Sequence, residues 1–152
     1  MPLTHAYGSR PTRGLPGVVA GFLFGAVLFV FAFFSAGFGH GSYLQASLFA
    51  APISFVPVGS LAIPIWWAVV GGLLWTRRHR AVVIALAIHT AFALVVLFTG
   101  TPNEPGGEQW RYFRETMGRS PLWMWSGLAL YGAGLLFVWS RALRLRPQAG
   151  QR

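Results

Sequence analysis

Four apolar segments without a charged residue constrain the fold of this chain more than any other feature. They cover residues 17–38, 58–75, 81–98 and 122–139, and each contains at least eighteen residues. Eighteen residues in an α-helix extend about 27 Å, close to the roughly 30 Å of a membrane's hydrocarbon core. Because that core offers no water to backbone groups, each segment is expected to be helical. The sequence therefore predicts an all-α integral membrane protein, built as a four-helix bundle.

The composition supports membrane insertion. Only 10% of the residues are charged, against roughly 25% in ordinary globular proteins, and the mean hydropathy is +0.55. The net charge of +9 comes from arginine, most of it in short clusters beside the apolar segments. A nucleic-acid binder would instead spread its basic residues over a water-exposed face. The expected partner is the lipid bilayer, and nucleic-acid binding is not predicted.

The arginines also predict an orientation. If the chain crosses the membrane four times, nine of its twelve arginines fall on one side: Arg10, Arg13, Arg77, Arg78, Arg80, Arg141, Arg144, Arg146 and Arg152. The positive-inside rule then puts both termini in the cytoplasm. Abundant Arg, Ala and Gly without Lys indicate a GC-rich bacterial genome, so the expected location is the bacterial inner membrane. We expect a single transmembrane domain over residues 1–152, with flexible tails at 1–13 and 147–152.

Both connections on the outer side are expected to contain a short interfacial helix. Residues 39–57 carry no charge, and Ser42 can cap a helix that runs to Ala51 before Pro52 stops it. This segment lies either in the membrane interface or re-entrant between the spans, and the sequence leaves both open. In residues 99–120 a turn-rich stretch precedes apolar residues at helical spacing, which indicates an amphipathic helix on the outer leaflet.

His89 is the one histidine within the four apolar segments, which contain no Asp, Glu, Lys or Arg, and it lies near the middle of the third. Ala85 and Ala93 share its helical row, so the ring is expected to face protein rather than lipid. One interpretation is a packing histidine that is hydrogen-bonded to a neighbouring helix. The other is an axial ligand to a haem or a chlorophyll-type pigment, which would make His89 a cofactor-binding residue.

The pair His40 and Tyr43 is a candidate for a site on the outer surface. Glycines flank His40 on both sides and allow unusual backbone angles, although a simple turn leaving the first helix explains them too. His79 lies among arginines and is expected to contact lipid headgroups. The chain has no Cys and its remaining candidate ligands are scattered, so a metal site is not predicted.

Gly17, Gly21 and Gly25 form a doubled small-xxx-small motif on the first segment. Such a motif lets another helix approach until the backbones touch. The contact is either with another helix of this chain or with a second subunit. The fourth segment offers Ala129 and Ala133 at the same spacing.

The function predicted from these features is that of a non-catalytic accessory or structural subunit in a larger membrane protein complex. Such a subunit needs helix-packing surfaces and few chemical groups, and it could also pack against bound pigment or haem. A small membrane channel or transport protein is the alternative, based on the uncharged residues 39–57. An enzyme is not expected, because the spans contain no nucleophile and base at a recognisable spacing.

Overall fold

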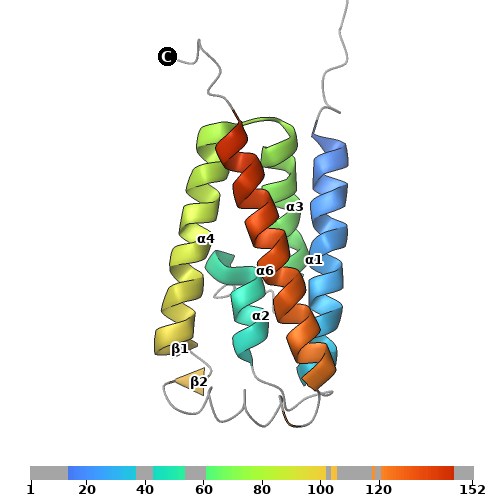
Figure 1. The fold of residues 1–152 in the computed structure, drawn as a ribbon, viewed down its shortest axis with the longest axis vertical. Coiled ribbons are helices and arrows are strands. Elements are labelled where there is room, and N and C mark those ends of the chain that lie inside the picture. The colour runs from blue at the N-terminus through green and yellow to red at the C-terminus, as the bar shows by residue number, and fades with distance from the viewer. Residues whose placement is uncertain are drawn as a thin grey trace, which may run out of the picture.

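The computed structural model describes residues 14–36, 43–53, 61–101, 104–105, 118 and 121–145. Within these residues the structure is helical apart from two short strands (Figure 1). The helices are α1 (Leu15–Ala36), α2 (Tyr43–Ala50), the 3₁₀ turn η1 (Ala51–Ile53), α3 (Ala62–Trp75), α4 (His79–Thr99) and α6 (Pro121–Arg144). The strands β1 (Gly100–Thr101) and β2 (Glu104–Pro105) pair antiparallel.

Three of the helices, α1, α4 and α6, are long and apolar enough to cross a membrane. The prediction of an all-helical membrane protein is confirmed at this level. The helix α3 is equally apolar but has only 14 residues, and so extends about 21 Å. Figure 1 shows it beside the three long helices.

Prolines lie where a helix tolerates them. Pro16, Pro64 and Pro121 all fall in the first turn of their helices, where a backbone N–H has no partner to lose. The start of α6 at Pro121 is the one that the sequence predicts.

The closest helix packing joins α1 to α3. A Cβ atom added to Gly21 would overlap the backbone carbonyl of Trp67, and one added to Gly17 would overlap the backbone of Gly71. Gly71 returns the contact, because its own Cβ would overlap the Gly17 carbonyl. Backbone therefore lies against backbone along this pair, as small residues permit in membrane helices.

The helix α2 is buried among the longer helices, which corrects its prediction as an interfacial helix. Gln45, Phe49 and Ala50 are at most 2% exposed. Figure 1 shows α2 between α4 and α6 in the half of the molecule farther from the chain's C-terminus. The physical reason is that the segment has no charged side chain that needs water, while α3 is too short to fill the interior alone. Of the two placements that the sequence left open, the structure favours the re-entrant one.

The turn between α3 and α4 is a helix-terminating motif of the Schellman type. The amide of Arg77 donates to the Leu74 carbonyl and the amide of Arg78 donates to the Leu73 carbonyl, each at 3.2 Å. The motif puts Arg77 in the left-handed conformation, with φ of 55°, at the position where glycine is usual. Thr76 adds a side-chain hydrogen bond to the Gly72 carbonyl at 2.9 Å.

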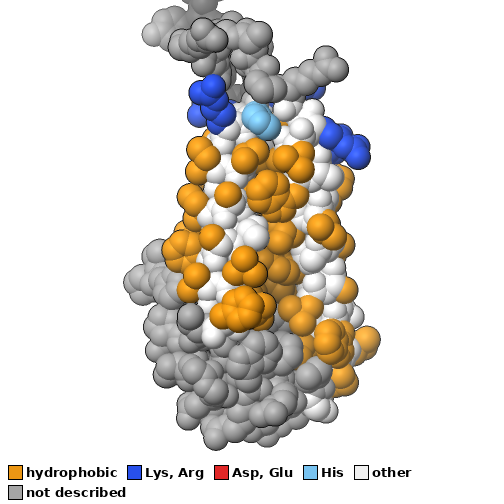
Figure 2. Space-filling view, turned by 60° about the vertical axis from the view of Figure 1, so that its left-hand side comes forward, with side chains coloured by type: hydrophobic (Ala, Val, Ile, Leu, Met, Phe, Trp, Pro, Cys, Tyr) orange, Lys and Arg blue, Asp and Glu red, His pale blue; other side chains and the backbone are white. Residues whose placement is uncertain are grey.

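The described arginines gather at one end of the molecule (Figure 2). That end holds the α3–α4 turn, the start of α1 and the end of α6, as Figure 1 shows. His79, for which the sequence predicts contact with lipid headgroups, lies there too and contacts α6. Its Nδ1 atom lies 3.0 Å from the Ala142 carbonyl in the last turn of α6, and this carbonyl also accepts a hydrogen bond from the Leu145 amide at 3.2 Å.

Candidate functional site

His89 lies at the centre of a buried cluster of aromatic rings and is 0% exposed. Its Nε2 atom is 2.7 Å from the hydroxyl of Tyr131, so this hydrogen bond joins α4 to α6. The Trp66 ring stacks on the imidazole at a centroid distance of 5.8 Å and an angle of 9°. The Trp67 ring meets it edge-on at 5.6 Å. Helices α3, α4 and α6 therefore converge on this one side chain.

The same cluster holds α2 in place. The Trp67 indole N–H donates to the backbone carbonyl of Phe49 at 3.0 Å, and the Phe49 ring lies 5.1 Å from the Tyr131 ring. The Gln45 side chain reaches the Met124 carbonyl of α6 at 3.4 Å. The helix α6 thus holds the start of α2 through Gln45, and α3 holds its end through Phe49. These two polar contacts fix the short helix in the interior.

Three polar atoms of this region are buried with no hydrogen-bond partner among the described residues: Gln45 Oε1, Trp66 Nε1 and His89 Nδ1. An unpaired polar atom in a low-dielectric interior costs on the order of 1–3 kcal/mol. Within the described part of the chain the polar groups of this interior are therefore only partly paired, and the packing of its rings has to offset that cost.

The residues around His89 do not fit a haem or chlorophyll-type macrocycle. An axial ligand presents a free ring nitrogen to an open space as wide as the macrocycle. Here Nε2 is bound to Tyr131, Nδ1 is buried, and two tryptophan rings pack against the imidazole. This geometry favours the packing interpretation of the residue.

The structure brings Gly17, Gly21 and Gly25 together on the face of α1 that contacts α3. Their partner surface includes Gly71, which the sequence analysis did not single out. The adjacent pair Gly71 and Gly72 in an apolar segment was the signal that could have found it. Of the two contacts left open by the sequence, the one within this chain accounts for the three glycines of α1.

Several predicted features lie outside the described residues. These are His40, the two tails at 1–13 and 147–152, and the amphipathic helix expected within residues 99–120, of which only residues 99–101, 104–105 and 118 are described. Tyr43 begins α2, but its side chain is not among those described. Among the described residues no group of three or more His, Cys, Asp or Glu could hold a metal ion.

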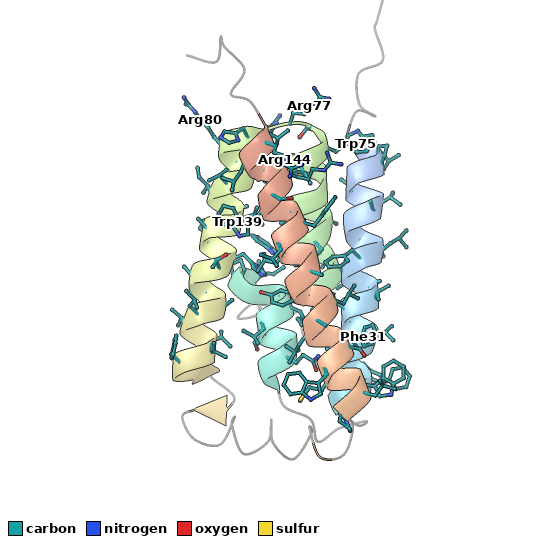
Figure 3. The ribbon with its side chains drawn as sticks, in the orientation of Figure 1. Phe31, Trp75, Arg77, Arg80, Trp139 and Arg144 are labelled. Carbon is teal, nitrogen blue, oxygen red and sulfur yellow. The ribbon has the colours of Figure 1, made fainter. Side chains whose placement is uncertain are left out.

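A cavity of about 1390 Å³ was not predicted from the sequence. Helices α1, α3 and α6 line it, and we call it the arginine groove because Arg77, Arg141 and Arg144 are its charged lining residues. Its apolar wall includes Ala20 and Phe24 of α1, Leu74 of α3, and Ala133 and Phe137 of α6. Figure 3 shows Arg77 and Arg144 at the same end of the molecule as Trp75, which also lines the groove.

Comparison with known proteins gives no relative: no protein-family model, no curated protein sequence and no solved structure matches this chain.

Proposed function

We propose that this chain is a non-catalytic accessory subunit of a larger bacterial inner-membrane complex. In this proposal α1, α3, α4 and α6 are the four spans of a bundle with both termini in the cytoplasm. The end that carries the described arginines is the cytoplasmic end, as the positive-inside rule requires. The three long apolar helices support membrane insertion, and the surface of α6 supports a partner.

The observation that carries the proposal is the outward face of α6 formed by Ala129, Gly132 and Leu136. Ala129 and Leu136 are exposed, and a Cβ atom added to Gly132 would meet nothing within 4 Å. The three residues follow one another at spacings of three and four, so they share one side of the helix. A glycine is not needed there to pack this chain, whereas it would let a partner helix approach closely.

This face differs from the glycine motif of α1. Gly17, Gly21 and Gly25 are already in contact with α3 and are not free to bind a second protein. The buried His89 cluster likewise serves contacts within the chain. The small-residue face that we propose for a partner helix is therefore the one on α6, and the glycines that the sequence indicated on α1 stabilise the subunit itself.

The test is to purify the full-length protein from its own membrane in mild detergent and to measure the mass of the particle by light scattering. We expect a complex of fixed stoichiometry, which Gly132→Leu dissociates. The matched control is Ala87→Leu, which places the same side chain at an exposed position of α4 and should leave the complex intact. A wild-type monomer, or a complex unchanged by Gly132→Leu, would overturn the proposal.

A second candidate, a small channel or transport protein, is favoured by the burial of α2. A short helix that enters among the spans and stops there is typical of membrane proteins that bind or conduct solutes. Gln45 is its buried polar side chain. Solute flux in reconstituted vesicles that Gln45→Leu abolishes would support this function, and vesicles as tight as protein-free ones would exclude it.

A further inference from the structure

We propose that the arginine groove binds one anionic phospholipid, with the phosphate at Arg77, Arg141 and Arg144 and an acyl chain along the apolar wall. This inference does not depend on the proposed function, because it concerns only the isolated chain and its lipid. The occupant to which the proposal commits is a phosphatidylglycerol.

The groove forms because the close contacts between α1 and α6 are made at two glycines of α6, Gly127 and Gly134. The Phe24 ring occupies the space where Gly134 lacks a side chain, and Phe31 does the same at Gly127. Toward the arginine end the α1 wall continues with the small Ala20. On α6, Val138 lies about one turn beyond Gly134, and Ala133, next to Gly134, also lines the cavity.

The length of the groove matches one leaflet. Its lining on α6 runs from Leu130 to Leu145, about 22 Å of helix. The Phe24 ring, which meets the Trp67 ring edge-on at 4.9 Å, lines the same cavity. A hydrocarbon core of about 30 Å has leaflets of about 15 Å, so the groove covers one leaflet and its headgroup boundary. An acyl chain fits such an apolar channel better than a soluble ligand does.

The charge of the groove selects an anion. Arg77, Arg141 and Arg144 are exposed at its end, and no Asp or Glu is among the described residues that line it. The chain has only three acidic residues, Glu104, Glu108 and Glu115, all in the connection that follows the far end of α4. Guanidinium groups bind phosphate oxygens with paired hydrogen bonds, and basic pockets between membrane helices bind anionic headgroups.

Two features fix the arginines at this place. The guanidinium of Arg141 lies 5.5 Å from the centroid of the Phe137 ring, a cation–π contact that orients it at the groove. Arg77 occupies the left-handed turn position with φ of 55°, which glycine would adopt without strain. An arginine at this strained position places a guanidinium group beside the groove.

The probe is phosphatidylglycerol, added to the delipidated full-length protein in neutral detergent and counted by native mass spectrometry. We expect one molecule to bind at least tenfold more tightly than phosphatidylcholine, and a tenfold excess of inorganic phosphate to leave it bound. Equal binding of the two lipids would overturn the proposal. Displacement by inorganic phosphate would overturn it as well, because it would show that the acyl chain contributes nothing.

Variants separate the groove from general surface charge. Arg77→Gly should lower phosphatidylglycerol affinity several-fold and still fold, because glycine prefers that backbone conformation. Ala133→Phe keeps every arginine but fills the apolar wall, and it should lower the affinity as well. The matched control is Arg80→Gln, whose side chain is on α4 at the same end but away from the groove (Figure 3). An equal loss in Arg80→Gln, or no loss in Ala133→Phe, would contradict this site.

Discussion

The Nε2 atom of His89 and the hydroxyl oxygen of Tyr131 lie 2.7 Å apart in the buried centre of the molecule. The two residues are 42 positions apart in the sequence, on α4 and α6. Both side chains of this hydrogen bond are buried, whereas a second side-chain bond between α4 and α6, from the Trp139 indole N–H to the Thr90 hydroxyl at 3.3 Å, is half-buried. The bond between His89 and Tyr131 ties two membrane helices together at the level where α2 ends.

Tyr131→Phe is expected to lower the free energy of unfolding by about 1 kcal/mol, in the range of hydrogen bonds between membrane helices. The substitution removes the hydroxyl but keeps the ring against Phe49, so the loss reports the bond to His89. Unfolding in mixed micelles, followed by far-UV circular dichroism, measures it. In a double-mutant cycle with His89→Phe the two losses should not add, and simple additivity would show that the pair is not coupled.

Gln45→Met is expected to leave stability unchanged or to raise it by up to about 1 kcal/mol, because the amide oxygen of Gln45 is buried without a described partner. Methionine has a similar volume and fills the same space without a polar atom. The contrasting variant Gln45→Glu puts a charge in this interior and should destabilise strongly. A clear loss of stability in Gln45→Met would mean that the contact with Met124 or an unseen partner of the oxygen matters more than its burial cost.

Reporter fusions test the orientation. A periplasmically active enzyme such as alkaline phosphatase, inserted at Asn103, should be active, and the same enzyme fused after Arg152 should be inactive. The physical basis is the arginine excess at one end of the molecule, which resists transfer across the membrane. Equal activity of the two fusions would place both sites on the same side of the membrane, so that α6 does not cross it between them, and the four-span proposal would fail.

The sequence predicts the long helices well because each depends on a local property. An uncharged apolar run between arginines is helical in a membrane whatever its neighbours are, and the proline at 121 marks a helix start without tertiary information. The position of α2 is different. Whether an uncharged short helix lies on the membrane or inside it depends on the space that the shorter α3 leaves, and this is a property of the packed structure.

The candidate sites show the same division. The sequence indicates that His89 needs a protein partner, but its identity as Tyr131 depends on the rotation of α6 relative to α4. The arginine groove combines residues of three helices and could not be predicted from any one of them. The glycines of α1 were recognised as a contact face, yet only the structure shows that Gly71 of α3 meets them.

The glycines also give the sharpest contrast between two similar substitutions. Gly21→Leu should unfold the subunit or separate α1 from α3, because even a Cβ atom at this position overlaps the Trp67 carbonyl. Both partners are backbone, so neither can move aside as a flexible side chain would. Inserting bulk into a packed interior costs typically 1–3 kcal/mol, and a leucine against backbone should cost at least about 3 kcal/mol.

Gly132→Leu is the matched control, since it adds the same side chain to a glycine of α6 that has open space around it. We expect its unfolding curve to match that of the wild type, while Gly21→Leu shifts to lower denaturant or fails to yield a folded protein. If Gly132→Leu is destabilised as much as Gly21→Leu, then Gly132 is packed against another part of the chain and its face is not free for a partner. If Gly21→Leu is as stable as the wild type, the backbone contact between α1 and α3 does not hold the subunit together.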